Sequence, residues 1–258
     1  MSTLKSETVF ITGASSGIGH AAAMSFAKEG CDLLLCARRM ARLEELKKEL
    51  HEQYPEIDIH ILELDVRDPK AVHLSLTALP EEWRMIDILV NNAGLSRGLD
   101  KLQEGLLSDW EEMIDTNVKG LLYITREIVP GMLIRGKGHI INIGSIAGHE
   151  VYPKGNVYCA SKFAVDAITK GLRMDLVDTP LRVTTIDPGL VETEFSKVRF
   201  HGDEEKAAQV YRTIKALSPE DVADAIVWSA SRPAHVQVAE IIIFPTAQAS
   251  AAVVHRTV

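Results

Sequence analysis

The sequence predicts an α/β fold, with a doubly wound parallel sheet of about seven strands in a single domain. Short apolar runs rich in β-branched residues alternate with longer segments of helical period over nearly the whole chain. Most of the runs are continuously apolar, which is typical of strands buried on both faces of a parallel sheet. The 258 residues are near the upper limit of one core and no linker interrupts the pattern, so one domain over residues 1–258 is expected.

Seven apolar runs are the expected strands of this sheet. Crossovers between parallel strands are right-handed, and the helices between the runs complete a doubly wound arrangement. Ligands of such folds bind beyond the carboxyl ends of the strands, so the residues after each run are the first candidates for a site. The runs are TVFIT (8–12), DLLLCA (32–37), DIHILEL (58–64), IDILVN (86–91), HIINIG (139–144), RVTTID (182–187) and EIIIF (240–244).

Five segments between these runs have a helical pattern. Residues 108–136 should hold two helices, the first opened by a capping-box pattern in which Ser108 and an aspartate precede Glu111. The last helix opens with the sequence SPED, which places Pro219 in its first turn. The segments are 17–29, 40–53, 108–136, 156–177 and 219–230.

The longest break in the alternation follows the sixth run, at roughly residues 189–205. It begins after Pro188 with Gly189 and continues with mixed polar residues. Because this break follows the carboxyl end of a strand, where ligands of such sheets bind, we expect a substrate lid at about residues 189–215.

Composition narrows the class of protein. A net charge of −8 and a pI near 5.6 argue against a nucleic-acid surface, which needs a basic stripe. The N-terminus has no long apolar segment typical of a secretory signal, and no run reaches the ~20 apolar residues of a membrane span. Three cysteines without CxxC spacing predict neither a disulfide framework nor a zinc or other metal site. We expect a cytoplasmic protein with reduced thiols and with neither nucleic-acid nor membrane partners.

A glycine-rich turn, TGASSGIG, follows the first run directly and opens the first helix. Its glycines allow backbone N–H groups to approach a pyrophosphate, and the helix N-terminus adds partial positive charge. The spacing is GxxxGxG and not GxGxxG, and a turn without a ligand is the alternative. The expected cofactor contacts in this turn are Gly13, Ser15, Ser16, Gly17, Ile18 and Gly19.

The end of the second run indicates which dinucleotide is bound. Enzymes that prefer NAD have an acid there for the ribose 2′-hydroxyl, whereas this chain has Ala37 followed by Arg38 and Arg39. Arginine binds a 2′-phosphate in a bidentate fork, so we infer NADP over NAD. The alternative is two solvated arginines at a helix start, where positive charge is unfavourable to the helix dipole.

Two further strand ends carry candidate cofactor contacts. Asp65 is placed to contact the adenine amino group with Val66 beside it; as an alternative, Asp65 caps the next helix ahead of Pro69. The fourth run ends in VNNAG, where Asn92, Ala93 and Gly94 leave room for a flat ring or sugar. The alternative at that position is an Asn-rich turn that closes the strand.

Taken together, these residues resemble the short-chain dehydrogenase/reductase family, whose fold is Rossmann-like. The matching segments, in the family's order and spacing, are TGASSGIG, NNAG, NVKG (117–120), Ser145, YCASK (158–162) and DPGLVET (187–193). The later segments GLVETEFSKVRFHGDEEKA, RPAHV and FPTAQA look like those of the bacterial and fungal NADP-dependent 3-hydroxy acid dehydrogenases, which also oxidise serine. The resemblance implies an NADP-dependent alcohol dehydrogenase or carbonyl reductase with a small-molecule substrate.

The catalytic roles follow from this resemblance and agree with the chemistry. Free tyrosine has a pKa near 10, and a cation favours the phenolate. Tyr158 and Lys162 lie at i and i+4, on one helix face, so we expect Lys162 to lower the pKa of Tyr158, the general acid/base. In the family this lysine also binds the nicotinamide ribose. Ser145 should hydrogen-bond the substrate oxygen, and Asn117 is implied to support a water in a proton relay.

The resemblance also implies contacts to the nicotinamide carboxamide from the segment after the sixth run. These contacts come from Pro188, Gly189, Val191 and Thr193; a Pro-Gly turn at a strand end is the alternative. The family resemblance further implies a homotetramer. The apolar residues around the helix of residues 117–134 suggest burial against another subunit.

A 3-hydroxy acid needs a cation for its carboxylate. Arg199 is the preferred anchor because it lies in the expected lid; His149, Lys154 and Arg97 are the other candidates. Cys159 is interpreted as a packing residue. Two other functions stay open: a carbonyl reductase for other ketones or 3-oxoacyl substrates, and a non-catalytic NADP-binding regulatory protein. The charges of residues 194–206 favour a small polar acid over a bulky ketone.

Overall fold

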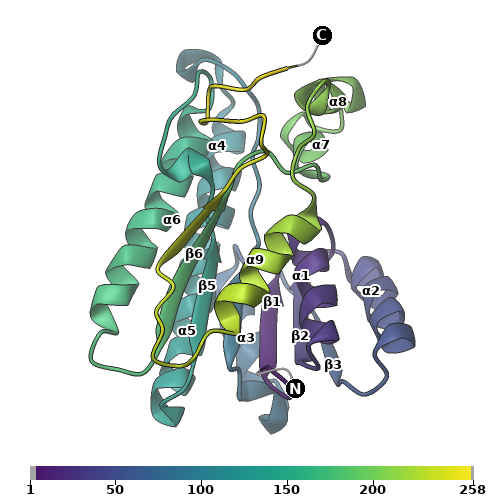
Figure 1. The fold of residues 1–258 in the computed structure, drawn as a ribbon, viewed down its shortest axis with the longest axis vertical. Helices are drawn as coiled ribbons and strands as arrows, with labels where there is room; N and C mark the ends of the chain where they lie inside the picture. Colours follow the sequence, from purple (N-terminus) through teal and green to yellow (C-terminus); the bar gives the residue numbers. More distant parts are fainter. Residues whose placement is uncertain (1–3, 257–258) are drawn as a thin grey trace.

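A seven-stranded parallel sheet forms the centre of the computed structural model, which describes residues 4–256 (Figure 1). The strand order is β3-β2-β1-β4-β5-β6-β7, so the direction of winding reverses between β1 and β4. That reversal is the place where an open α/β sheet leaves room for a ligand. The strands are β1 (Thr8–Thr12), β2 (Asp32–Ala37), β3 (Ile59–Glu63), β4 (Ile88–Asn91), β5 (His139–Ile143), β6 (Arg182–Pro188) and β7 (Glu240–Ile243).

All seven predicted strands are confirmed, and so is the doubly wound fold. The central strands β1, β4 and β5 are buried almost throughout, as their continuous apolar runs predict. Boundaries differ by one or two residues: β3 and β4 begin later than expected, and β6 includes Pro188. Within residues 4–256, none of the helices combines the length and apolar composition that crossing a bilayer requires.

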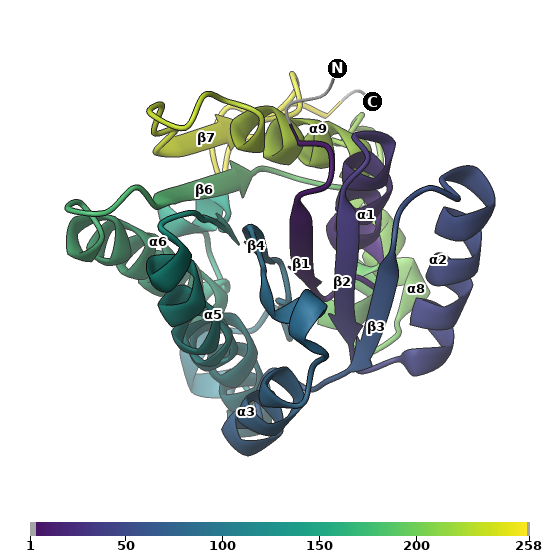
Figure 2. The ribbon, with the colours of Figure 1, turned by 90° about the horizontal axis from the view of Figure 1, so that it is seen from below.

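Helices cover both faces of the sheet. Side chains of α1, α2 and α9 join one buried cluster, and side chains of α3, α5 and α6 pack into the other. Figure 2 shows the two helical layers on opposite sides of the strands. The helices of these layers are α1 (Gly17–Lys28), α2 (Met40–Gln53), α3 (Pro69–Thr77), α5 (Leu121–Arg135), α6 (Asn156–Asp175) and α9 (Pro219–Ala230).

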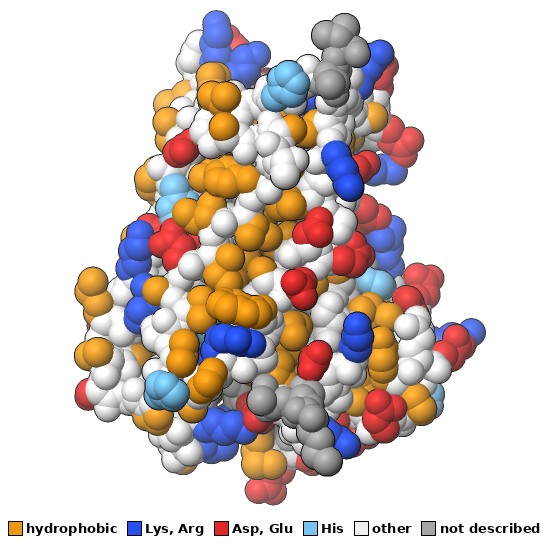
Figure 3. Space-filling model, in the orientation of Figure 1, with side chains coloured by type: hydrophobic (Ala, Val, Ile, Leu, Met, Phe, Trp, Pro, Cys, Tyr) orange, Lys and Arg blue, Asp and Glu red, His pale blue; other side chains and the backbone are white. Residues whose placement is uncertain are grey.

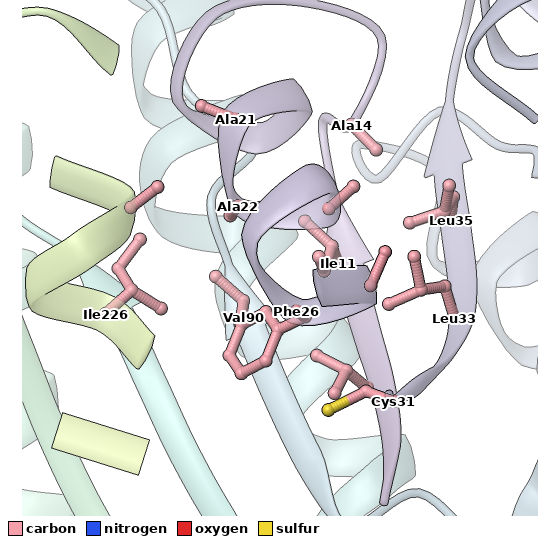
Figure 4. Close-up of a cluster of buried hydrophobic side chains, with 14 of the residues drawn as sticks. Ile11, Ala14, Ala21, Ala22, Phe26, Cys31, Leu33, Leu35, Val90 and Ile226 are labelled. Atoms are coloured by element: carbon pink, nitrogen blue, oxygen red, sulfur yellow. The ribbon is translucent and has the colours of Figure 1, made fainter. Parts of the chain in front are cut away.

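The larger of the two buried clusters supports the glycine-rich turn that follows β1. Phe26 of α1 packs among Val90 of β4 and Ile226 of α9, with Ile11 of β1 nearby (Figure 4). Phe26 is fully buried, and replacing such a phenylalanine with alanine costs about 3–5 kcal/mol. This packing therefore stabilises the carboxyl end of β1, which leads into the glycine turn.

The predicted capping box at Ser108 is wrong. Helix α4 (Leu107–Ile114) begins one residue earlier, with Leu106 at its N-cap and no side-chain cap. Ser108 therefore lies within the first turn of the helix, where Asp109 contacts His201 at 3.1 Å. At α9 the predicted place of Pro219 in the first turn is confirmed, and Ser218 and Asp221 cap each other's backbone groups.

The two predicted helices of residues 108–136 are joined by a π-helical segment, Asp115–Gly120. Gly120 allows this wide turn to approach the sheet: a Cβ there would lie 2.6 Å from Cγ2 of Val66. π-Helical turns often occur at functional sites, and this one carries Asn117 into the interior, where it is buried.

The break after β6 is not irregular throughout. It contains two short helices, α7 (Phe195–Arg199) and α8 (Glu204–Tyr211), of which the second is capped by Asp203. Figure 1 shows both beyond the carboxyl ends of the strands. We call residues 189–215 the lid segment from here on.

Candidate active site

One cavity of about 810 Å³ opens at the carboxyl edge of the sheet. Its walls come from the ends of six strands, from α6, from the lid segment and from the last residues before Arg256. Most of the residues predicted from the sequence meet here: Gly13, Ser15, Ser16, Gly17, Ile18, Arg38, Arg39, Asp65, Val66, Asn92, Ala93, Gly94, Ser145, Tyr158, Lys162, Pro188, Gly189, Val191, Thr193 and Arg199.

The glycine turn forms a cradle against the end of β4. Gly13 has φ +67°, and a Cβ there would lie 2.9 Å from the Ala93 backbone. Gly19 lies behind the wall, where a Cβ would come within 2.5 Å of the Gly13 carbonyl. Asn92 donates from Nδ2 to the carbonyls of Thr12 and Gly13, at 2.9 and 3.2 Å, and so fastens the turn.

The first turn of α1 has N–H groups to offer a ligand. Its N-cap, Ser16, makes no side-chain cap, and the first turn carries no acidic residue. Helix N-termini of this kind bind phosphate. The cradle therefore fits a dinucleotide diphosphate, and Gly13, Gly17 and the α1 backbone are the groups that would hold it.

Positive charge gathers at the end of β2. Arg39 donates to the hydroxyls of Ser15 and Ser16, at 3.1 and 2.9 Å. Its guanidinium also pairs with Glu194 of the lid segment at 3.1 Å, and Arg42 pairs with the same carboxylate at 2.8 Å. Sequence reasoning missed Arg42 and Glu194, although Arg42 follows Arg39 by one helical turn and shares its face.

Arg38 is placed differently from its neighbour. Its guanidinium lies 3.6 Å from Glu112 of α4, and half of the side chain is exposed. It still lines the cavity beside Arg39. Two arginines and two serine hydroxyls at one end of the cavity form a donor set that suits a 2′-phosphate.

Asp65 lines the same end of the cavity. It pairs with Arg67 at 2.6 Å, and the hydrogen bonds and charge of Arg67 hold the pKa of this carboxyl below its ordinary value despite partial burial. The cap of α3 is Asp68, which accepts from the backbone of Lys70 and Ala71. The alternative that Asp65 caps this helix is therefore wrong, and its contact with adenine stays a prediction.

The structure brings Ser145, Tyr158 and Lys162 together in one wall of the cavity. Tyr158 and Lys162 share the buried face of α6, with the Lys162 ammonium 6.0 Å from the centre of the Tyr158 ring. That ammonium donates to the Ile143 carbonyl at the end of β5, at 2.8 Å. Ser145 follows β5, and its backbone N–H donates to Asp187 at 3.0 Å.

Burial dominates the electrostatics of this wall. It raises the pKa of the Tyr158 hydroxyl well above its ordinary value, while the Arg199 guanidinium and hydrogen bonding with Ser145 act in the opposite direction. Burial also lowers the pKa of Lys162 to about 8, partly offset by the charge of Asp187. Lys162 is not among the main contributions to the Tyr158 shift, so its predicted effect on Tyr158 stays a prediction.

Asn117 braces the wall from behind. Its amide exchanges two hydrogen bonds with the Leu95 backbone, both at 2.8 Å, and donates a third to the Ser161 hydroxyl at 3.0 Å. Thr116 lines the cavity, whereas its neighbour Asn117 does not. These contacts tie the π-helical segment to α6; the predicted relay water stays a prediction.

Arg199 lies over Tyr158. Its guanidinium carbon is 5.3 Å from the centre of the Tyr158 ring and 5.1 Å from that of Phe195. It donates to the hydroxyls of Ser96 and Tyr152, at 3.0 and 2.9 Å. Sequence reasoning missed both partners, because nothing in their local sequence marks them as polar contacts of a residue in the lid segment.

The other three cations proposed for a substrate carboxylate lie elsewhere. Arg97 pairs with Glu112 at 2.7 Å, Lys154 is exposed, and His149 faces Asp187 and Glu240. Of the four candidates in the described part of the chain, Arg199 alone is in the cavity wall. Cys159 is buried beside Tyr152, and burial raises the pKa of its thiol, as expected of a packing residue.

Comparison with known proteins agrees with this arrangement. A model of the short chain dehydrogenases matches residues 7–204. The chain belongs to that family, and the resemblance inferred from its motifs is confirmed. The chain is 45% identical over 257 residues to the NADP-dependent 3-hydroxy acid dehydrogenase of Schizosaccharomyces pombe, with 99% of each chain covered.

Two further relatives are similar over almost their whole length. The NADP-dependent 3-hydroxy acid dehydrogenase of Escherichia coli K12 is 47% identical over 250 residues, which cover 96% of this chain and 99% of that one. A closed form of serine dehydrogenase solved with NADP+ superposes with a TM-score of 0.90 at 47% identity, covering 97% of this chain and all of the other.

Proposed function

We propose that this protein is an NADP-dependent oxidoreductase that interconverts the hydroxyl of small 3-hydroxy acids, such as serine or 3-hydroxypropionate, and the corresponding carbonyl. The observation that carries the substrate assignment is the position of Arg199 above Tyr158. A carboxylate on the guanidinium and a hydroxyl at Tyr158 would be separated by two C–C bonds of about 1.5 Å each. The names of the relatives support the same cofactor and substrate class.

Each polar group of the cavity has a role in this proposal. NADP supplies the hydride acceptor, or the hydride donor in the reverse reaction. Tyr158 takes the proton from the substrate hydroxyl as general base, and Ser145 hydrogen-bonds the same oxygen. Lys162 holds positive charge next to the tyrosine and binds the ribose. Asn117 keeps α6 in place through Ser161 and supports the proton relay.

The charges of the lid segment do not by themselves select an acid. Lys197 and Glu204 pair with each other and are exposed, so they face solvent and not the substrate. The residues of this segment that line the cavity are largely apolar, and Arg199 is the cation among them. Within the lid segment, Arg199 is therefore the residue that favours an acid substrate.

Replacement of Arg199 with methionine tests the substrate class. We expect KM for L-serine or 3-hydroxypropionate to rise about 10- to 100-fold, because a charge-assisted hydrogen bond is lost. KM for an uncharged secondary alcohol should change little. Lys197→Met is the matched control, since it removes a cation from the same helix that is paired on the surface. Equal effects on charged and uncharged substrates would exclude Arg199 as the anchor.

A carbonyl reductase for larger ketones or 3-oxoacyl substrates is the second candidate. Leu99, Phe195, Val198 and Phe200 line the cavity and could pack against an apolar chain. A screen of NADPH consumption with 3-oxoacyl thioesters beside 3-oxo acids separates the two. The first proposal requires the higher kcat/KM with the small acids.

We also propose a cytoplasmic homotetramer. The three thiols are free and buried, which suits a reducing compartment. Most apolar residues of the helix of residues 117–134 pack into the chain's own core and so do not argue for an interface. Figure 3 instead shows a band of apolar side chains over β7 and α9, where Ile242 and Trp228 are exposed. Light scattering of the wild type and of Trp228→Glu tests this assembly.

A further inference from the structure

A cluster of three titratable side chains lies next to the wall formed by Ser145, Tyr158 and Lys162, and the proposed reaction assigns no role to the cluster. His149 follows the short helix after Ser145, Asp187 is in β6, and Glu240 begins β7. Nε2 of His149 is 3.5 Å from Oδ2 of Asp187 and 3.2 Å from Oε1 of Glu240. The three atoms all lie within 4.8 Å of one another, so they converge on one point.

The central member of this cluster is buried and only half satisfied. Asp187 is 1% exposed. Its Oδ1 accepts from the Ser145 backbone and the Thr185 hydroxyl, at 3.0 and 3.1 Å. Its Oδ2 points at His149 without a hydrogen-bond partner among residues 4–256, and Nε2 of His149 likewise has none. A buried carboxylate oxygen left in this way is costly unless another group compensates it.

We propose that His149, Asp187 and Glu240 bind a divalent first-row transition-metal ion of the Zn²⁺ type. One imidazole nitrogen and two carboxylate oxygens are a donor set that suits zinc. Ligand atoms at about 2.0–2.2 Å from a tetrahedral zinc are roughly 3.3–3.6 Å apart, and the two separations at Nε2 are 3.5 and 3.2 Å. A single imidazole N–H could satisfy at most one of the two carboxylates.

The surroundings of the three ligands suit a tetrahedral cation whose fourth coordination position is open to solvent. His149 and Glu240 are 18% and 29% exposed, so the ion has a path from solvent. Two lysines interact electrostatically with these carboxylates: Lys162, held by the Ile143 carbonyl, and Lys170, paired with Asp166 at 2.8 Å. Two carboxylates therefore leave the cluster negatively charged. Mg²⁺ prefers oxygen ligands in octahedral geometry and fits less well.

The three ligands come from separate segments, which explains why no metal motif is visible in the sequence. Cysteine spacing predicted no metal site, and this proposal departs from that expectation without involving any thiol. Because Asp187 also accepts from the Ser145 backbone, a bound ion would hold the carboxylate that positions the catalytic serine.

Binding of ZnCl₂ to metal-stripped protein, followed by calorimetry, tests the proposal. We expect one site per chain with a Kd in the micromolar range or tighter, and a visible absorption band of tetrahedral Co²⁺ when cobalt replaces zinc. His149→Ala and Glu240→Gln should each weaken Zn²⁺ binding at least tenfold. Both side chains are partly exposed, so these variants test the site even where Asp187→Asn fails to fold.

The matched control is His73→Ala, which removes an exposed histidine paired with Glu127 at 3.1 Å. It should bind Zn²⁺ as the wild type does. Binding weaker than millimolar in the wild type, or equal binding by wild type, His149→Ala and Glu240→Gln, would overturn the proposal. The proposal would also be overturned by an octahedral Co²⁺ absorption spectrum that is the same in the wild type and in His149→Ala.

Discussion

The floor of the cavity and the lid segment are held by different kinds of interaction. In the floor, buried or part-buried hydrogen bonds join segments that are distant in the chain: Asn92 to Thr12, Asn117 to Leu95, and Lys162 to Ile143. In the lid segment, exposed ion pairs join Glu194 to Arg39 and Arg42, and part-buried hydrogen bonds join Arg199 to Ser96 and Tyr152. The floor is therefore held by buried contacts, whereas the lid segment is attached at Glu194 by exposed pairs that cost little to break.

The energies of these contacts explain the difference. Leaving a buried polar group unsatisfied costs about 1–3 kcal/mol, whereas an exposed ion pair contributes about 0–1 kcal/mol. Four predictions test this contrast between the floor and the lid segment, in order from the largest expected effect to the smallest.

Tyr158→Phe removes the proton-transfer group and leaves the floor intact. We expect kcat to fall roughly 10²- to 10⁴-fold, the usual contribution of general acid–base catalysis, with an unchanged Kd for NADPH. Stopped-flow rates and fluorescence titration measure the two quantities. Activity within tenfold of the wild type would contradict the role of Tyr158, and absence of turnover in the wild type would favour the regulatory alternative.

Arg38→Ala combined with Arg39→Ala removes the donors at the end of β2. NADPH should bind about 10- to 100-fold more weakly, because charge-assisted hydrogen bonds to a phosphate are lost. NADH, which lacks that phosphate, serves as the internal control and should lose much less. Equal loss with both cofactors would contradict the assignment of the 2′-phosphate to these arginines.

Acid should destabilise the central sheet that carries the floor. His139 of β5 is buried, and burial holds its pKa well below the ordinary value. The unfolded chain therefore takes up a proton near pH 6.5 that the folded chain does not, so stability falls as pH drops below that value. Between pH 6.5 and 5 the loss is up to about 2 kcal/mol.

Urea unfolding at pH 7 and pH 5 measures this loss, with His139→Gln as the comparison. Glutamine can still reach the Thr184 hydroxyl, which His139 contacts at 2.7 Å, but it does not titrate. A pH dependence as steep in the variant as in the wild type would show that another group is responsible.

Glu194→Gln should have the smallest effect. It removes the pairs with Arg39 and Arg42, and the free energy of unfolding should change by less than about 1 kcal/mol because both pairs are exposed. NADPH should bind as tightly or a few-fold more tightly, since a carboxylate beside the phosphate donors is gone. A loss above about 2 kcal/mol would mean that the lid segment is fastened as firmly as the floor.

The amino-acid sequence by itself determined the strands, most helices and the candidate residues of the cavity wall. TVFIT and DLLLCA are strands at the predicted boundaries, because an apolar run and its flanking turn are local properties. Tyr158, Lys162 and the glycine turn were predicted for the same reason, since helix spacing and glycine conformation depend on near neighbours.

Only the tertiary structure decided the contacts between distant segments. Asp109 of α4 contacts His201, Arg39 contacts Glu194, and Arg199 contacts Ser96. The cluster of His149, Asp187 and Glu240 has the same origin. Parallel strands need long crossovers, so the residues that meet at one edge of the sheet are far apart in the chain, and no local pattern records which of them pair.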